Sequence, residues 1–330
     1  MKNIYIASRG KLQRKENTLY FISEEGEKKA LPVESIANIF CLNKVSLTHG
    51  AIQLLLRKNV CVHFFHEDFY IGSLMPKQKY QAGFLLIKQV QAYLDERQRV
   101  TIANEIVDAL RYNMIKVLEK YDVLRDDVQR LRNFNVDEEY EEIKQAAWKS
   151  SKFVVLSIES KLWNIFYTCL DKILKGYKLE KRTKRPPKNE ANAIVSFCNS
   201  LLYTTILSEI HKTHLNPTIS YLHEPFERRY SLALDFAEPF KPILTYRILI
   251  YLVNNDMLRS VHFQRKLDGI LLSELGRKLV IKEFDRRINE TIKIKGKGRR
   301  SLRVFMRKQA YNLERYLIEK SRFEAFRLRY

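Results

Sequence analysis

Cysteine is scarce in this chain, and its placement gives no support for a cysteine-based site. Four cysteines occur in 330 residues, each among apolar neighbours and far from the others, at Cys41, Cys61, Cys169 and Cys198. No C-x-x-C pair occurs, so the usual spacing of a structural zinc site is missing. We therefore expect four buried thiols.

Long hydrophobic runs are also missing. No stretch approaches the roughly 18 consecutive apolar residues of a membrane-spanning helix, and the opening residues MKNIYIASRG contain no apolar run of the signal-peptide kind. Hydrophobic residues nevertheless make up 45% of the chain, as in a globular protein. We expect a cytoplasmic protein with no membrane partner, and the length suggests two domains.

Acidic residues are too few to balance the basic ones. The chain has 38 Asp and Glu against 59 Lys and Arg, a formal net charge of +21. The excess lies in residues 1–88 and 259–330, whereas residues 89–258 are nearly balanced. Membrane surfaces and acidic proteins also attract cations. A nucleic acid is the favoured partner, because phosphate neutralisation dominates affinity for nucleic acids.

The first part of the chain has the pattern of strands and turns. Short runs rich in Ile, Val, Phe and Tyr predict strands, and a capped amphipathic segment predicts one helix at 46–59. The expected strands lie at 2–7, 18–23, 37–42, 60–65 and 69–75. Residues 1–78 are therefore predicted to form a small β-rich domain.

The rest of the chain is poor in glycine and has apolar residues at helical spacing. Residues 79–98 are interpreted as a linker with the first helix, and residues 99–330 as a larger all-α domain, which gives an α+β two-domain fold. The predicted helices lie at 81–95, 99–121, 123–133, 137–149, 151–176, 189–213, 239–256, 262–288 and 301–328.

Two basic connectors separate these helices, KGYKLEKRTKRPPKNE at 175–190 and KIKGKGRRS at 293–301. Charge runs are often only solvated surface, but these two are predicted to bind phosphates without reading bases. The residues expected to do so are Lys181, Arg182, Lys184, Arg185, Lys295, Lys297, Arg299 and Arg300.

One carboxylate lies on an unexpected helix face. In the predicted helix 151–176, Glu159 falls about 40° from Val155, inside the arc occupied by Ile158, Leu162 and Phe166. A solvated Glu belongs on the opposite face. Three interpretations stay open, namely a structural ion pair with Arg or Lys, a helix crossing where the arc opens to water, and a metal ligand or catalytic acid.

A second group of polar residues lies in YLHEPFERRYSLALDFAEPFKP, residues 221–242. His223 precedes Asp235 by twelve residues, and Glu238 follows three later. One helical turn would put both acids on the same face at the cost of repulsion. Pro239 disfavours a helical backbone at Glu238, which could instead begin the next helix. On its own, His223 is more often a hydrogen-bonded histidine than a ligand.

Glu159, His223 and the two acids together form a mixed set of oxygen and imidazole groups. Carboxylates suit Mg²⁺ and Mn²⁺, and one imidazole shifts the preference towards Mn²⁺. Basic connectors near such a site would hold a phosphodiester backbone beside the metal. That combination is typical of metal-dependent phosphodiester enzymes.

These segments resemble the CRISPR-associated integrase, the metal-dependent nuclease family of spacer acquisition. The similarity covers essentially the whole chain. It rests on segments in matching order: LPVESIANIF, VSLTHGAIQLLLRKNVCVHFF, the IE pair ending at Glu159, RPPKNEANAIVSFCNSLLY, NPTISYLHE and SLALDFAEPFKP.

The resemblance implies that Glu159, His223 and Glu238 hold Mn²⁺ or Mg²⁺, with Asp235 as a supporting acid of the catalytic group. It implies insertion of short duplex DNA into a CRISPR array by attack of a 3′-hydroxyl on a phosphodiester, and cleavage of branched DNA by the same site. It further implies a homodimer joined through the β domains, and a small second CRISPR adaptation protein that bridges two such dimers.

Asn192 and Ser196 belong, by the same resemblance, to a motif beside the site. They share one helix face with Asn199 and Tyr203. That face is interpreted either as solvated surface or as a polar wall that binds DNA phosphates or supports the metal ligands.

Two other functions fit part of this pattern. A non-catalytic, architectural DNA-binding protein would explain the charge but gives no reason for Glu159 to lie in an apolar arc. A general branched-DNA repair nuclease would use the same site.

Overall fold

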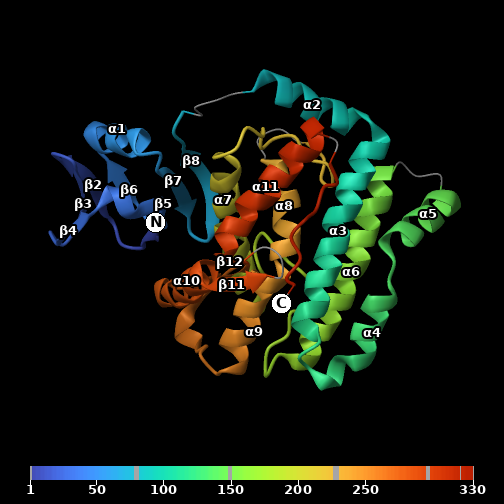
Figure 1. Cartoon of the computed structure of the whole chain (residues 1–330). Coiled ribbons are helices and arrows are strands. Elements are labelled where there is room, and N and C mark those ends of the chain that lie inside the picture. Colours follow the sequence, from blue (N-terminus) through green and yellow to red (C-terminus); the bar gives the residue numbers. More distant parts are fainter. Residues whose placement is uncertain are drawn as a thin grey trace.

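Strands come first along the chain and helices follow (Figure 1). The computed structural model describes residues 2–77, 82–147, 151–225, 230–294, 298–319 and 321–329. The strand-rich part lies beside the larger helical part, as the sequence predicts.

The strand-rich part contains two four-stranded sheets, in the orders β1-β5-β7-β8 and β4-β3-β2-β6. Leu12, Leu19, Ile39, Leu55 and Val62 are among the residues of its own buried core. Its elements are β1 Lys2–Ile6, β2 Gly10–Lys15, β3 Thr18–Ser23, β4 Lys28–Leu31, β5 Ile36–Cys41, β6 Val45–Leu47, α1 His49–Arg57, β7 Cys61–His66 and β8 Phe69–Leu74.

The five predicted strands are confirmed as β1, β3, β5, β7 and β8. The sequence missed β2, β4 and β6, which are short or carry exposed Lys and Gln on one side. Such half-polar strands give a weak periodic signal, because only one face is buried.

The helical part begins with α2 Gly83–Leu94, and most of its predicted helices are confirmed. The long ones are α3 Glu96–Leu118, α6 Ser151–Ile173, α7 Glu190–Ile210, α10 Glu274–Asn289 and α11 Leu302–Glu319. The shorter ones are α4 Arg125–Asn133, α5 Val136–Ala147, α8 Ser231–Ala237 and α9 Arg247–Asn254. All four cysteines are buried and unpaired, as expected.

This part is largely helical, as predicted, but it departs from the predicted helices in three places. A hairpin of β9 Phe263–Lys266 and β10 Gly269–Leu272 replaces the first turns of the helix expected at 262–288. A second hairpin pairs β11 Thr291–Ile294 with β12 Gly298–Ser301. The helix expected at 301–328 ends at Glu319, and residues 321–329 are extended.

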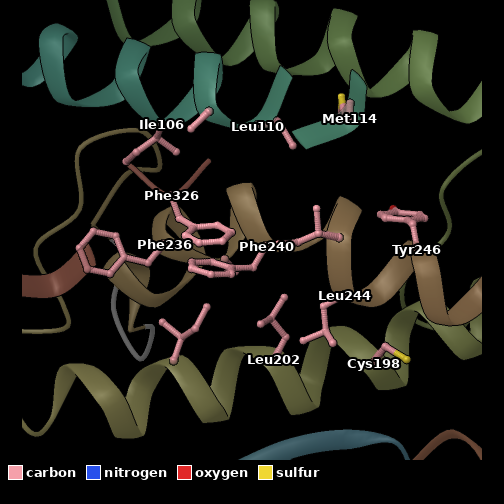
Figure 2. Close-up of a cluster of buried hydrophobic side chains, with 14 of the residues drawn as sticks. Ile106, Leu110, Met114, Cys198, Leu202, Phe236, Phe240, Leu244, Tyr246 and Phe326 are labelled. Carbon is pink, nitrogen blue, oxygen red and sulfur yellow. The ribbon is translucent and has the colours of Figure 1, made fainter. Parts of the chain in front are cut away.

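A broken helical segment crosses the middle of the helical part, between α3 and α7 (Figure 2). It consists of α8, a 3₁₀ turn at Glu238–Phe240, a π-helical turn at Pro242–Tyr246, and α9. Pro239 and Pro242 supply no amide hydrogen, so a regular ladder of helical hydrogen bonds cannot continue through them. π-helical turns often lie at functional sites.

Buried polar contacts fix the strand-rich part against the helical part. His63 on β7 bonds through Nε2 to Ser208 Oγ on α7 at 2.7 Å. Asp68, in the turn between β7 and β8, accepts a bond from the backbone N–H of Leu272 at 2.9 Å. Both side chains are almost fully buried, so these contacts are shielded from water.

Helix α7 is the one described helix that is long and apolar enough by composition to cross a membrane. However, 89% of its apolar window is buried inside the protein. It is therefore a core helix, and the cytoplasmic location stays a prediction.

Candidate active site

Helix α6 presents one side of the site. Glu159 and Trp163 are four residues apart, so they lie on the same helix face. Val155, Ile158 and Leu162 around them are buried, whereas Glu159 is partly exposed. The Glu therefore emerges from the apolar face that the sequence indicated.

Asp235 on α8 organises the loop that carries His223. Its Oδ2 accepts from the backbone N–H groups of Tyr221 at 2.6 Å and Leu222 at 3.0 Å. Its Oδ1 accepts from the backbone N–H of His223 at 2.9 Å and lies 2.8 Å from His223 Nδ1. Asp235 is fully buried, and both of its oxygens are occupied. It holds the imidazole in place with Nε2 as the ring nitrogen left for a ligand.

The same contact determines the proton affinity of His223. Burial alone would lower the pKa of His223, but the hydrogen bond and negative charge of Asp235 reverse this and raise it above the ordinary value. A carboxylate behind an imidazole in this way fixes its tautomer and increases its basicity as a ligand.

Glu238 is fully buried and faces α6. Its Oε2 accepts the indole N–H of Trp163 at 3.2 Å, and its Oε1 forms an ion pair with Lys241. Lys241 lies one turn further on, and its ammonium is 5.6 Å from the ring centres of both Trp163 and Tyr203. Glu238 is thus part of a folded turn and not of a free loop.

Burial raises the pKa of Glu159 to about 7, and the negative charge of Glu238 adds to this effect. Lys241, His223 and a hydrogen bond from Trp163 oppose it. The carboxylates of Glu159 and Glu238 therefore both interact with the indole of Trp163 and the ammonium of Lys241, and they repel each other. A carboxylate pair of this kind is stabilised by a nearby cation.

The donor set suits a divalent metal ion by chemistry, since it offers two carboxylates and one oriented imidazole. However, within the part of the chain that the structure describes, no three His, Cys, Asp or Glu side chains are close enough to hold a metal together. Glu238 points instead to Lys241 and Trp163. The chemistry of these side chains fits a divalent ion, but their present positions do not bring them together, because Glu238 is bonded to Trp163 and Lys241.

The polar face predicted on α7 is not solvated. Asn192, Ser196 and Asn199 are all buried. Asn192 donates to the carbonyls of Leu179 and Lys181 at 3.1 Å each, and its Oδ1 accepts from the backbone N–H of Thr183 and from Arg182. The side chain of Asn192 therefore presents no exposed surface to DNA in this structure, and its bonds support the connector at 175–190. A role of this motif beside the site stays a prediction.

Arg182, a residue of the connector at 175–190, is partly buried rather than exposed. Its guanidinium donates to Asn192 Oδ1 at 2.8 Å and to Ser196 Oγ at 2.9 Å. Thus the connector and α7 form one unit, in which Ser196 also accepts a bond and is almost inaccessible.

Lys184, in contrast, is exposed and lies within electrostatic reach of the two carboxylates. Loss of hydration and the neighbouring cations Lys241 and Arg182 lower the pKa of Lys184, while Glu238 and Glu159 oppose this. The connector therefore reaches the candidate site.

The other predicted phosphate-binding residues are spread over the surface. Lys181 and Arg185 are exposed, and Arg185 lies over the ring of Phe69 at 5.5 Å. Arg299 and Arg300 are exposed on β12. Lys295 and Lys297 lie outside the described residues.

Two residues of the site were missed from the sequence, Trp163 and Lys241. Both had a signal, because each lies one helical turn from a predicted acid, four residues after Glu159 and three after Glu238. Trp163 is further fixed by Tyr167, whose ring stacks on it at 5.4 Å.

Comparison with known proteins connects this site to a family. The family model described as CRISPR associated protein Cas1 matches residues 4–286. The chain belongs to the Cas1 family. A relative from Nanoarchaeum equitans, named CRISPR-associated endonuclease Cas1, is 55% identical over 336 residues, covering 100% of each chain.

Solved structures agree with this family assignment. A Cas1 protein from Thermotoga maritima is similar with a TM-score of 0.84 and 34% identity, over 98% of this chain and 100% of that one. A casposase bound to an integration product has a TM-score of 0.80 at 20% identity, over 100% of this chain and 96% of that one. At that identity the casposase shows a shared fold.

Proposed function

We propose that this protein is a metal-dependent DNA endonuclease and integrase that joins short duplex DNA to a CRISPR array. Its partners would be duplex spacer precursor, CRISPR repeat and branched DNA. The Cas1 family assignment supports the substrate class. The observation that carries the proposal is that His223, held by the buried Asp235, lies within electrostatic reach of Glu159 and Glu238.

Glu159, His223 and Glu238 would hold one Mn²⁺ or Mg²⁺. When bound, such an ion polarises the scissile phosphate and stabilises the charge that builds up on its oxygens. The protein's own groups prepare the site for this. Asp235 keeps Nε2 of His223 available, and Trp163 fixes one oxygen of Glu238.

Lys241 and Lys184 would act on the negative charges around the reaction. Lys241 pairs with Glu238 in this structure, and it would have to give up this pair for Glu238 to serve as a ligand. Lys184, exposed beside the carboxylates, would contact the DNA backbone next to the reacting phosphodiester. A 3′-hydroxyl that attacks the phosphorus would form a new P–O bond while the bond between the phosphorus and the 3′-oxygen of the target strand breaks. The attacking hydroxyl loses its proton and the leaving 3′-oxygen gains one, so the target strand ends in a new 3′-hydroxyl.

The assembly is part of the same proposal. A homodimer through the strand-rich parts, bridged by the small second adaptation protein, would place separate helical parts on a shared DNA. This rests on family membership alone.

The test is a change of His223 to Ala, measured by Mn²⁺-dependent cleavage of branched DNA and by joining of a labelled duplex to a CRISPR repeat. Loss of a ligand that supplies several kcal/mol of transition-state stabilisation should lower both rates by about 100-fold or more. His66→Ala, on the exposed end of β7, is the control. If His223→Ala cleaved and joined DNA at wild-type rates, the assignment of His223 as a ligand would be refuted. If the wild-type protein cleaved branched DNA but joined no duplex to the repeat, it would be a branched-DNA nuclease.

A further inference from the structure

Residues Ser321–Arg329 follow α11 as an extended segment, called here the C-terminal strap. Phe323, Ala325, Phe326 and Leu328 of the strap are buried. The strap therefore belongs to the core of the helical part, although it forms no helix and pairs with no described strand.

The backbone of the strap is bonded by side chains of neighbouring helices. The N–H of Ala325 donates to Glu105 at 2.9 Å, the N–H of Phe326 to Gln309 Oε1 at 2.8 Å, and the N–H of Leu328 to Asn113 Oδ1 at 2.8 Å. Each of these bonds fixes a backbone group that would otherwise be buried without a partner.

Two of these side chains also hold the turn around Glu238. Asn113 Nδ2 donates to the carbonyl of Pro239 at 2.7 Å and to that of Phe326 at 2.9 Å. Gln309 Nε2 donates to the carbonyl of Phe236 at 3.2 Å. Asn113 and Gln309 are almost completely buried. The side-chain amide of Asn113 thus links the carbonyl of Pro239 to the strap, and that of Gln309 links the carbonyl of Phe236 to the strap.

A ring contact adds to these bonds. Phe326 of the strap stacks on Phe240, with ring centres 4.7 Å apart and planes 12° from parallel. Figure 2 shows these rings face to face, with Phe236 beside them. The ring of Phe326 also packs against the ring of Phe305 on α11, with ring centres 5.2 Å apart. The strap therefore packs directly against the residue that ends the 3₁₀ turn.

The turn needs this support because its own hydrogen bonds are incomplete. Pro239 and Pro242 supply no amide hydrogen, and the side chain of Glu238 points away from the strap, towards Trp163 and Lys241. The carboxylate of Glu238 therefore faces the site, and the backbone around Glu238 is held by contacts with the strap.

We infer that the C-terminal strap is a positioning element of the site, which acts through Asn113, Gln309 and Phe326 to hold the turn that carries Glu238. The inference rests on the proposed function where it concerns metal binding. Metal ligands depend on such outer contacts, whose removal typically weakens metal affinity about 10- to 100-fold.

The experiment compares Mn²⁺ binding and hydrogen exchange in the full chain. Asn113→Ala and Gln309→Met remove the bridges to Pro239 and Phe236. The matched control is Asn254→Ala, because Asn254 also bridges two backbone groups, the carbonyl of Ile173 and the N–H of Lys175, away from the turn. Thermal unfolding without metal measures how far each variant is destabilised.

We expect all three variants to unfold at lower temperature. Only Asn113→Ala and Gln309→Met should raise the dissociation constant for Mn²⁺, by about 10-fold or more, and speed amide exchange in residues 236–241. If both variants bind Mn²⁺ and exchange like Asn254→Ala, the inference is wrong. Having two substitutions keeps the test valid if one variant fails to fold.

Glu238→Gln separates this inference from the proposed function. If Glu238→Gln loses Mn²⁺ affinity but Asn113→Ala and Gln309→Met do not, the ligand assignment stands and the strap is not a positioning element. If Glu238→Gln binds Mn²⁺ like the wild type, the ligand assignment fails, and with it the link between strap and metal. Exchange at residues 236–241 then decides whether the strap holds the turn.

Discussion

At the scale of single residues, Asp235 has the most demanding position in the site. Two carboxylate oxygens meet three consecutive backbone N–H groups and one imidazole nitrogen. A charged group with no access to water is tolerated only when such bonds replace its hydration. Asp235 therefore shapes the loop and the ligand at once, and its oxygens are not available to a metal.

Asp235→Asn should damage stability and metal binding together. An amide keeps only one accepting oxygen and turns two N–H donors towards groups that also donate, so buried N–H groups lose their partners. We expect a loss of about 2–4 kcal/mol in the free energy of unfolding and a roughly 10- to 100-fold weaker affinity for Mn²⁺. Urea unfolding and Mn²⁺ titration measure the two effects. Wild-type stability would show that the network is unimportant.

The sequence could indicate Glu159, because helical periodicity gives the direction of each side chain. It could not establish the role of Asp235, which depends on the loop at 221–223 folding over α8. It also left open whether the polar face of Asn192 is solvated or supports the site, since either use gives the same pattern along a helix. Asn192 bonds backbone groups of Leu179, Lys181 and Thr183 in the connector at 175–190. This connector has no regular secondary structure, so no periodic pattern in the sequence could predict these bonds.

At the scale of elements, the hairpin of β9 and β10 is the clearest failure of prediction. Ile270, Leu271 and Leu272 continue smoothly into the apolar pattern of α10, so the sequence favoured one long helix. Asp268 and Gly269, residues that favour turns, were the contrary signal. A side chain at Gly269 would begin 2.4 Å from the carbonyl of Pro187, so this glycine lets the hairpin approach the connector.

The turn between β7 and β8 makes the stability of this hairpin contact depend on pH. Burial raises the pKa of Asp68 from 3.8 to about 6, although Leu272 and Arg277 oppose the shift. Between these values the folded protein binds more protons than the unfolded chain. Its free energy of unfolding therefore falls as the pH rises from about 4 to about 6.

Asp68→Asn should remove this contribution. Between pH 4 and pH 6 the wild type should lose roughly 2 kcal/mol relative to the variant, measured by urea unfolding at several pH values. Glu67→Gln, which breaks the exposed ion pair to Lys266 beside it, is the control and should change stability by less than about 1 kcal/mol. Parallel curves for wild type and Asp68→Asn would contradict the expectation.

At the scale of the whole molecule, the two-part architecture and the order of its elements follow from patterning. The distribution of basic side chains over the surface does not follow from patterning, because the fold decides which of them are exposed and which lie close together. The two connectors lie far apart in the sequence. Within the connector at 175–190, the structure shows that Arg182 is held by a hydrogen bond to Asn192, whereas Lys181 is exposed. Counting charges alone treats both kinds as equal.

Exposed cations of the connectors should determine the salt dependence of DNA binding. Changing Lys181 and Arg185 to Gln, or Arg299 and Arg300 to Gln, should reduce the slope of log affinity against log salt by about 0.9 for each DNA phosphate that is no longer neutralised. Binding of one duplex at several salt concentrations measures this. Lys29→Gln, exposed on edge strand β4 at the far end of the strand-rich part (Figure 1), is the control. An unchanged slope would place the DNA elsewhere.

If Glu238 is the ligand that we propose, its ion pair with Lys241 would make the site selective among cations. The ammonium of Lys241 is attached to the same turn, so it competes at every moment and at any protein concentration. Potassium and sodium carry the same single charge as this ammonium and gain little by displacing it, whereas a divalent ion brings twice the charge to two carboxylates. Monovalent salts would then leave the ion pair of Glu238 and Lys241 intact, and a divalent ion would bind more weakly than it would to a Glu238 without this partner.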